Sequence, residues 1–435
     1  MNEENDGTTK QKVFDWIDEN EADLVNLLQD LVRIPSVSGK EYDVQVRVQQ
    51  EFEQMGLFPE MVYPDIEDLR EHEDYFETTS FKEYEYEDRP NVVGVWEGTG
   101  EGKSMCLSGH IDVVPVEPLE KWSRDPWSGE VDDGGVYGRG SGDMKGGVAA
   151  MIHALKALQK CDVKLAGDVQ IETTIEEEDG GIGGVLYLRM VRPPTDAAII
   201  PEPTDLSISV ASAGVMYFRV TVPGRPAHAA TAHYGVNAAE KAIHVIQALA
   251  QLNQERQRTI HYSFAEVDPK MKDHATTINL GVISAGDWPS TVPGNCVLEY
   301  RIGWPPGETR GEVMEQVENA IQNAAQQDEW LKKNPPTVEW FGWWARPHEI
   351  DLSDSFLEVI KNEVESVTGS KPVLYGGSAG LDTRHFVHHG IPAVTCGPRA
   401  ERIHSFDEVV HIDSLIDTAK AVAATTLEWC GQVSS

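Results

Sequence analysis

The chain of 435 residues is 40% hydrophobic and 25% charged, which is ordinary for a soluble globular protein and long enough for two domains. Its 72 acidic and 36 basic side chains give a formal net charge of −36. A field of this sign excludes nucleic acid and an anionic membrane surface as partners, and it favours a salt-rich cytoplasm, where salt screens the self-repulsion.

The cysteines and the N-terminus agree with a cytoplasmic location. Five cysteines without a CxxC pair do not make a disulfide framework. Residues 1–6 are acidic and lack the basic and apolar regions of a signal peptide. No apolar run approaches the ~20 residues that span a bilayer. We therefore expect a cytoplasmic protein that does not insert into membranes.

Along the first 213 residues, predicted strands alternate with predicted helices. Apolar periodicity predicts helices at 11–33, 43–55 and 145–158, and strands at 91–96, 104–108, 169–175 and 197–200. The stretch 59–90 is dense in acids and aromatics, shows little periodicity, and is interpreted as a long surface excursion. The alternation indicates an α/β fold with a mainly parallel, helix-covered sheet.

The pattern changes near Gly214, where apolar and polar residues begin to alternate. The predicted order is strand 216–222, helix 237–256, strands 277–282 and 296–302, helix 312–326 and strand 338–341. This βαββαβ order is typical of a split βαβ sandwich. Helix 353–368, strand 393–396 and helix 414–429 follow. We expect an α+β domain at 214–342, inserted between two parts of the main domain, 1–213 and 343–435.

Histidines and carboxylates follow several of the predicted strands. Loops after the carboxyl ends of such strands meet at one edge of a sheet. The candidates are His110, Glu176, Glu177, Glu202 and His404, together with Asp143 in a glycine-rich turn. Asp112 lies two residues after His110, where a carboxylate can orient the imidazole. Two imidazoles and several carboxylates at one point are what a pair of divalent metal ions requires.

A single carboxylate carries little weight in a chain with 72 acids. The run 176–179 alone would more often be a solvated acidic loop, and a lone histidine is more often structural. The conjunction of five segments is what favours a metal site. The glycine-rich turn 138–142 has neither Walker spacing nor GxGxxG, and no G-x-S-x-G elbow supports a serine hydrolase.

Six segments resemble one known family. These are 109–115 (GHIDVVP), 138–147 (GRGSGDMKGG), 176–178 (EEE), 201–204 (PEPT), 224–229 (GRPAHA) and 397–405. They are similar to the co-catalytic zinc metallopeptidases that include acetylornithine deacetylase, succinyl-diaminopimelate desuccinylase, aminoacylase and carboxypeptidase G. The similarity runs from about residue 23 to residue 427. It implies a zinc-peptidase-like catalytic domain, in two parts, with the inserted domain as a lid and dimerisation domain.

The resemblance also implies roles for individual residues. Two zinc ions per subunit, with cobalt or manganese as alternatives, would be bridged by Asp143. His110 and Glu202 would complete one site, and Glu177 and His404 the other. Glu176 would be the general base, and Asp112 would steady His110. His228 resembles a histidine that polarises the scissile carbonyl in a partner subunit's site, which implies a homodimer.

The sequence departs from the family pattern where a substrate carboxylate would bind. Amino-acid-cleaving relatives carry an arginine ten residues after the proline of the Val-Pro motif, and Gly303 stands there. An asparagine three residues before that proline is replaced by Ser290. Arg301 and Arg384 are candidate replacement clamps for the substrate.

The resemblance leaves several functions open. The main hypothesis is a two-metal amidohydrolase that removes an acyl group from a small N-acyl amine or amino acid, as acetylornithine deacetylase does. The alternatives are a dipeptidase or carboxypeptidase, a deformylase of an N-formyl amine without an α-carboxylate, and a non-catalytic binding homologue. The complete set of candidate ligands and base argues against the last.

Overall fold

The computed structural model describes residues 2–433, and side chains from residue 9 onward. The chain forms two compact units. The first comprises 1–210, 349–375 and 381–435, and the second comprises 211–348 and 376–380. Within the described residues, no helix is both long and apolar enough to cross a membrane.

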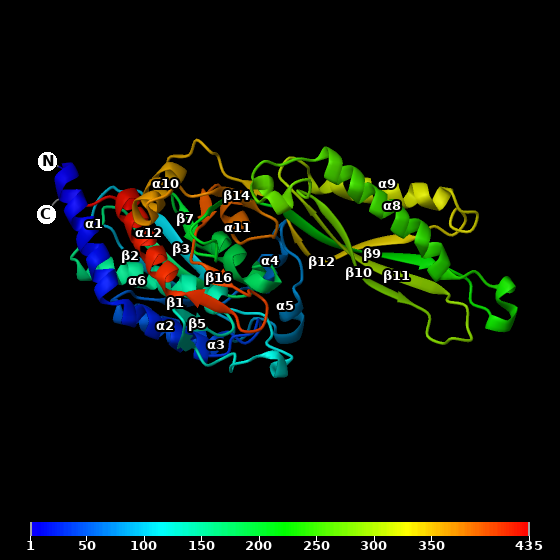
Figure 1. The fold of residues 1–435 in the computed structure, drawn as a ribbon, viewed down its shortest axis with the longest axis horizontal. Coiled ribbons are helices and arrows are strands. Elements are labelled where there is room, and N and C mark those ends of the chain that lie inside the picture. Colours follow the sequence, from blue (N-terminus) through cyan, green and yellow to red (C-terminus); the bar gives the residue numbers. More distant parts are fainter. Residues whose placement is uncertain (1, 434–435) are drawn as a thin grey trace. The chain divides into compact units, whose positions relative to one another are not determined.

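The first unit is organised around a mixed sheet (Figure 1). The strand order is β1 (Glu60–Val62), β2 (Asn91–Trp96), β6 (Val169–Thr174), β3 (Met105–His110), β7 (Ala198–Ile200), β15 (Ala393–Thr395), β8 (Ile208–Ser212) and β13 (His348–Glu349), and β14 (Leu374–Gly377) pairs with β8. The central strands β6, β3, β7 and β15 are parallel, whereas β2 and β8 join them in the antiparallel sense. The expected α/β class is therefore confirmed, with antiparallel strands at the flanks of a parallel centre.

Helices bury the apolar side chains of this sheet. The longer ones are α1 (Asn2–Glu19), α2 (Glu21–Arg33), α3 (Tyr42–Gln54), α6 (Gly146–Lys160), α10 (Ser355–Thr368) and α12 (Ile412–Cys430), and the shorter ones are α4 (Ile66–Arg70), α5 (Thr79–Tyr84), α7 (Tyr187–Val191) and α11 (Thr383–His388). In α2 the buried leucines recur at helical spacing, so one stripe faces the core. The single helix expected at 11–33 is two helices, because the chain breaks at Asn20.

The parallel strands end at the same edge of the sheet. His110 is the last residue of β3, and β6 ends two residues before Glu176. Strand β7 ends two residues before Glu202. The expectation that these segments deliver polar side chains to one edge is met by the topology.

A small sheet brings the segments that carry Asp143 and His404 together. Its order is β16 (Ala400–Glu401), β17 (Val409–His411), β5 (Gly135–Tyr137) and β4 (Glu130–Asp132). His404 lies in the loop between β16 and β17. Asp143 follows β5, and β5 pairs with β17 through Tyr137 and Val409. Pairing of these strands therefore places the His404 loop beside the turn that carries Asp143.

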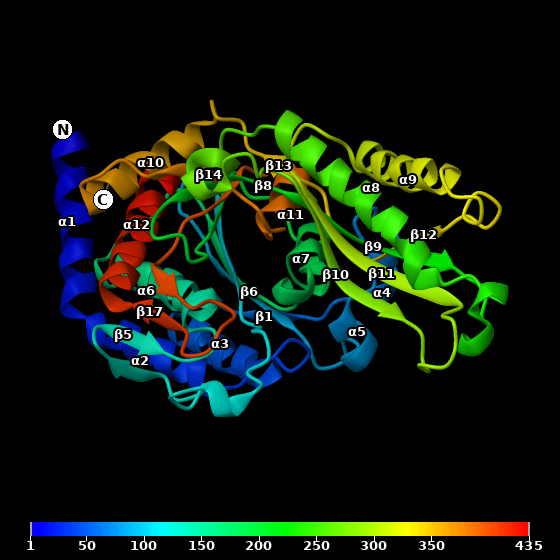
Figure 2. The same cartoon turned by 45° about the vertical axis from the view of Figure 1, so that its right-hand side comes forward.

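The second unit has the predicted βαββαβ order. It comprises β9 (Gly214–Pro223), α8 (Ala238–Thr259), β10 (Thr277–Ala285), β11 (Asn295–Trp304), α9 (Arg310–Gln326) and β12 (Thr337–Ala345). The antiparallel sheet runs β10-β11-β9-β12, and in both views α8 and α9 lie together on one of its faces (Figures 1 and 2). Alternating buried residues of β9, such as Phe218 and Val220, form a core with both helices.

Candidate metal centre

Asp143 lies between two histidines that are far apart in the sequence. His110 Nε2 is 3.1 Å from Asp143 Oδ1, and His404 Nε2 is 3.2 Å from Asp143 Oδ2. Each carboxylate oxygen therefore faces a different imidazole. A carboxylate placed between two imidazoles in this way is able to bridge two cations.

A second carboxylate accompanies each histidine. Glu202 Oε1 is 3.6 Å from His110 Nε2, and Glu178 Oε2 is 2.9 Å from His404 Nε2. The structure thus forms two groups of three that share Asp143. His404, Glu178 and Asp143 make one group, and His110, Glu202 and Asp143 make the other.

The spacing of these ligand atoms fits divalent metal ions. Nitrogen and oxygen ligands at 2.0–2.2 Å from a tetrahedral zinc ion lie about 3.4 Å from one another. The separations of 2.9 to 3.6 Å between these nitrogen and oxygen atoms are close to this value. One ligand atom each from His110, Asp143 and Glu178 also lies within 4.8 Å of the other two. Imidazole and carboxylate are ligands that zinc, cobalt and manganese all accept.

The electrostatics of the cluster also fit cations. Burial and then the Asp143 charge raise the pKa of Glu202 well above its usual value, and the same causes raise the pKa of Glu178 to about 7. Burial opposes the charged form of His110, but the carboxylates of Glu202 and Asp143 outweigh it and raise its pKa. Hydrogen bonds to Asp143 and Glu178 raise the pKa of His404 to about 10. Positive charge would therefore stabilise the ionised forms of these crowded carboxylates, and metal ions would supply it.

Asp112 supports the cluster in two ways. Its main-chain carbonyl is 2.9 Å from His110 Nδ1, so the carbonyl, with the carboxylate farther away at 3.6 Å, orients the imidazole. Its carboxylate accepts the backbone N–H groups of Glu177 and Glu178 and the hydroxyl of Ser38. Asp112 therefore fixes both one ligand and the turn that carries another.

Glu408 holds the Asp143 turn and was not among the residues predicted from the sequence. Its buried carboxylate accepts the backbone N–H groups of Gly140, Gly142 and Asp143. Arg139 Nη1 donates to it over 2.6 Å. The only sequence indication was its position four residues after His404.

Glu176 does not lie where a general base would have to be. Its side chain is fully buried, and both carboxylate oxygens are occupied by donors from other segments. These donors are Thr78 Oγ1 at 2.7 Å, Ser80 Oγ at 2.6 Å, Tyr86 OH at 2.8 Å, Gly183 N at 2.8 Å and Arg89 Nη1 at 3.3 Å. A carboxylate held in this way is poorly placed to accept a proton from water.

In the structure, the glutamate that contacts His404 lies one residue later in the chain than expected. Glu178, which was not predicted as a ligand, contacts His404, whereas Glu177 was expected there. Among the described residues, no hydrogen bond or ion pair engages the Glu177 carboxylate. The pKa of Glu177 is raised, mainly because the side chain is buried. The charges of Asp382, Glu178 and Asp143 raise it further, whereas His110 opposes them. Glu177 therefore stands beside the cluster with a free carboxylate.

The surface interpretation of 59–90 was wrong at its C-terminal end. Thr78, Ser80, Tyr86 and Arg89 are buried, and they surround Glu176. The stretch lacks periodicity because it is held by polar contacts to the acidic turn rather than by an apolar face. Short helices α4 and α5 lie within it.

Gly147 packs closely against the backbone of Pro201, the residue before Glu202. A Cβ added at Gly147 would lie 2.0 Å from the carbonyl oxygen of Pro201. Gly147→Ala is therefore expected to destabilise the protein by about 1–3 kcal/mol in denaturant unfolding, because the neighbouring backbone must shift. Gly311→Ala is the control, since nothing lies within 4 Å of its added Cβ in helix α9. Equal stability of the two variants would show that the contact is easily relieved.

Arg384 is a structural residue rather than an available substrate clamp. Its side chain is 3% exposed, donates to the Leu381 carbonyl over 2.9 Å, and also bonds the Gly180 carbonyl. Burial lowers its pKa. The guanidinium therefore braces the loop that follows the acidic turn.

The other predicted residues belong to the second unit. Arg301, on β11, donates weakly to the Ser378 carbonyl over 3.4 Å. His228 is exposed, and its Nδ1 accepts the Ala230 N–H at 3.1 Å, which leaves Nε2 as the protonated nitrogen of the neutral ring. The exposed Ser290 accepts the Ala229 N–H through its carbonyl, so its loop is hydrogen-bonded to the His228 turn.

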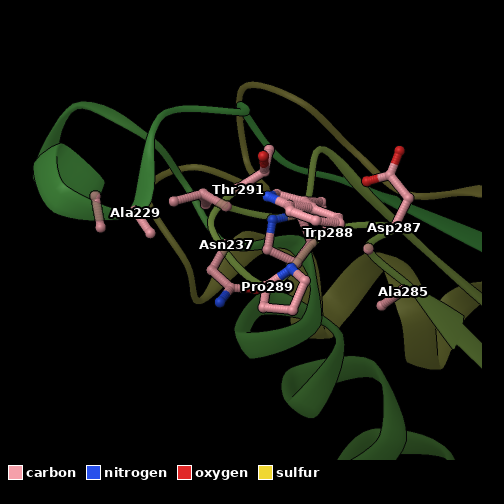
Figure 3. Close-up of a pocket in the computed structure, with 11 residues that line it drawn as sticks. Ala229, Asn237, Ala285, Asp287, Trp288, Pro289 and Thr291 are labelled. Atoms are coloured by element: carbon pink, nitrogen blue, oxygen red, sulfur yellow. The ribbon is translucent and has the colours of Figure 1, made fainter.

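A hollow of about 560 Å³ lies beside this turn. Figure 3 shows the Trp288 indole there, near Thr291 and Pro289. Trp288 is 68% exposed. An exposed tryptophan beside a surface hollow is available for contact with a ligand or another chain.

The chain belongs to Peptidase family M20/M25/M40, whose model matches residues 106–428. The resemblance found in the sequence is thereby confirmed, and the protein is a hydrolase of amide bonds in this family.

Individual relatives are similar over almost the whole chain. The N-formyl-4-amino-5-aminomethyl-2-methylpyrimidine deformylase of Halalkalibacterium halodurans is 27% identical over 446 residues, with 97% of each chain covered. The succinyl-diaminopimelate desuccinylase of Methylobacterium radiotolerans is 27% identical over 402 residues, covering 90% of this chain and 93% of its own. A Staphylococcus aureus tripeptidase shares the fold, with a TM-score of 0.73 at 21% identity over 94% of this chain and 98% of its own.

Proposed function

We propose that the protein is a two-metal amidohydrolase that removes a formyl group from a small amine lacking an α-carboxylate. The main support for a two-metal centre is the position of Asp143, because its two carboxylate oxygens face His110 and His404 separately. One metal ion would be held by His110, Asp143 and Glu202, and the other by His404, Asp143 and Glu178. Zinc is the proposed metal, with cobalt or manganese as substitutes.

Glu177 is proposed as the general base, in place of Glu176. When bound, the ions would polarise the scissile carbonyl and lower the pKa of the attacking water. Glu177 takes the proton from the attacking water and passes it to the leaving nitrogen. Its free carboxylate beside the cluster suits this task, whereas the donors around Glu176 do not leave that side chain free. Water and an N-formyl amine thereby give formate and the free amine.

Two observations favour the deformylase over the deacylases and peptidases. The arginine expected to bind an α-carboxylate is absent, because Gly303 occupies its position and Arg384 is buried in structural contacts. The pyrimidine deformylase of Halalkalibacterium halodurans is similar over 97% of this chain. An acetylornithine deacetylase-like reaction needs a carboxylate clamp, for which Arg301 is the remaining candidate.

A substrate panel tests this proposal. N-formyl aminomethylpyrimidine, N-acetylornithine, succinyl-diaminopimelate and simple dipeptides are compared with zinc at high salt. The N-formyl amine is expected to give the highest kcat/KM by at least about tenfold, equal to about 1.4 kcal/mol. Chelation should abolish activity, and zinc, cobalt or manganese should restore it. A preference for substrates with an α-carboxylate, or activity insensitive to chelation, would contradict the proposal.

We further propose that the second unit is a lid and that two copies pair through it in the cytoplasm. Strand β10 is an edge of its sheet, and Val282 and Ile283 on it are 48% and 59% exposed. An exposed apolar edge strand is suited to pairing with a second copy. The proposed boundaries of the insertion are 214–342. The high acidity supports a salt-rich cytoplasm as its setting.

His228 is proposed to donate a hydrogen bond from Nε2 to the developing oxyanion in the other copy's site. Variants His228→Ala and Glu177→Gln should each be inactive alone. Mixing them under conditions that exchange subunits should restore part of the activity, because each mixed dimer contains one complete site. Failure to regain activity, despite proven exchange, would place His228 elsewhere in the mechanism.

A further inference from the structure

Segment 78–89 donates hydrogen bonds to both ends of the acidic turn 176–179. At the first end this segment supplies most of the donors to the Glu176 carboxylate. At the other end the Ser80 N–H donates to Asp179 Oδ2 over 2.7 Å. The two proposed chemical residues, Glu177 and Glu178, lie between these attachment points.

The hydrogen bonds to Glu176 stabilise a backbone conformation that is unfavourable for this residue. Its φ of +68° lies in the left-handed region, which residues with a Cβ rarely adopt. The turn also closes on it, since the N–H groups of Asp179 and Gly181 donate to the Glu176 carbonyl. A residue in such a conformation persists when its surroundings over-determine it. Loss of donors to its side chain would therefore let the turn relax and would move Glu177.

The ring of Tyr86 is packed between Phe81 and the acidic turn. Its ring packs on Phe81, with 4.7 Å between ring centres. A Cβ at Gly183 would lie 2.4 Å from the Tyr86 ring, so the glycine admits the ring against the turn. Burial, followed by the Glu176 charge, raises the pKa of the phenol, so the hydroxyl remains a donor.

The segment is also anchored to the body of the first unit. Arg89 donates through Nε and Nη2 to the two oxygens of Glu41, each over 2.9 Å. Both side chains are almost fully buried, and Glu41 directly precedes helix α3. This two-bond geometry fixes the guanidinium while its Nη1 reaches Glu176.

We propose that segment 78–89 is a positioning clamp, with Tyr86 its main member, that acts through Glu176 to aim Glu177 and Glu178 at the metal centre. The inference rests on the proposed function of those two glutamates. Tyr86 touches neither substrate nor ligands in this scheme, so it is a positioning residue. Its effect should appear in turnover rather than in substrate binding, because it controls the direction of the base.

Tyr86→Phe tests the clamp, since it removes only the hydroxyl and keeps the ring against Phe81 and Gly183. The expected result is a kcat at least about tenfold lower with KM nearly unchanged. Tm should also fall, because the buried Glu176 carboxylate loses one of its donors. Phe81→Leu is the matched control, because it loosens the same ring without removing a donor to the Glu176 carboxylate. It should lower Tm and leave kcat close to that of the parent.

A double variant distinguishes an effect on the position of Glu177 from a general loss of protein stability. Tyr86→Phe added to Glu177→Gln should cause little further loss of kcat, because both changes act through the same base. A kcat for Tyr86→Phe equal to that of the parent would overturn the clamp, as would fully additive losses or an equal loss in Phe81→Leu.

Amide exchange distinguishes failure of the clamp from failure of the proposed function. If the parent protein hydrolyses none of the amides, the proposed function fails. The N–H groups of Glu177 and Glu178, which donate to Asp112, should still exchange at least about tenfold faster in Tyr86→Phe than in the parent. Unchanged exchange at both positions would overturn the clamp independently of activity.

Discussion

Glu177→Gln is expected to reduce kcat by about 10²–10⁴-fold while leaving two metal ions bound per chain. Glutamine keeps the shape of the side chain but does not accept a proton at neutral pH. Metal binding should persist, because the proposed ligands are other side chains, among them Glu178 and Glu202. Turnover of the preferred amide and metal content by elemental analysis are the two measurements.

Two further variants make this result specific. Glu176→Gln should lower Tm, because the amide group cannot accept all the donors around it, and its kcat should exceed that of Glu177→Gln. Glu71→Gln, at an exposed acidic position, should behave like the parent. If Glu176→Gln were the metal-loaded but inactive variant, the original assignment of the base would hold instead.

Asp143→Ala is expected to have the largest effect on the metal centre. Asp143 is shared by both proposed sites, so its loss should reduce metal content from about two ions per chain to one or fewer. Changes to groups that merely support metal ligands cost about 10–100-fold in affinity or activity. Removal of a shared ligand should therefore cost more than about 100-fold in kcat/KM.

The control for Asp143→Ala is Asp68→Ala, at an exposed position in α4. It should retain both ions and full activity. Titration of each metal-free protein with zinc, followed by calorimetry, gives the stoichiometry directly. Two ions bound to Asp143→Ala with parent-like affinity would exclude the bridge.

Much of the first unit's architecture could be predicted from the sequence, because each strand of the parallel centre is a short apolar run followed by a polar residue. His110 and Glu202 were found from strand endings, Asp143 from its glycine-rich turn, and His404 from the loop after strand 393–396. The structure brings these four residues together. Strand endings and glycine turns are local features. They fix where a side chain leaves the sheet.

The choice among Glu176, Glu177 and Glu178 could not be made from the sequence. All three have the same chemistry, and which one faces the cluster depends on the left-handed backbone at Glu176. That conformation is set by partners about ninety residues earlier, in a stretch without helical or strand periodicity. Long-range polar contacts of this kind leave no periodic pattern to read.

The most direct test of the metal centre is a crystal structure of the zinc-loaded protein with anomalous scattering. Two peaks about 3.5–4 Å apart, bridged by Asp143, are expected. One should contact His110 and Glu202, the other His404 and Glu178, with Glu177 near both but bound to neither. A single peak, or a zinc ion bound by Glu176 or Glu177 in place of Glu178, would contradict this account.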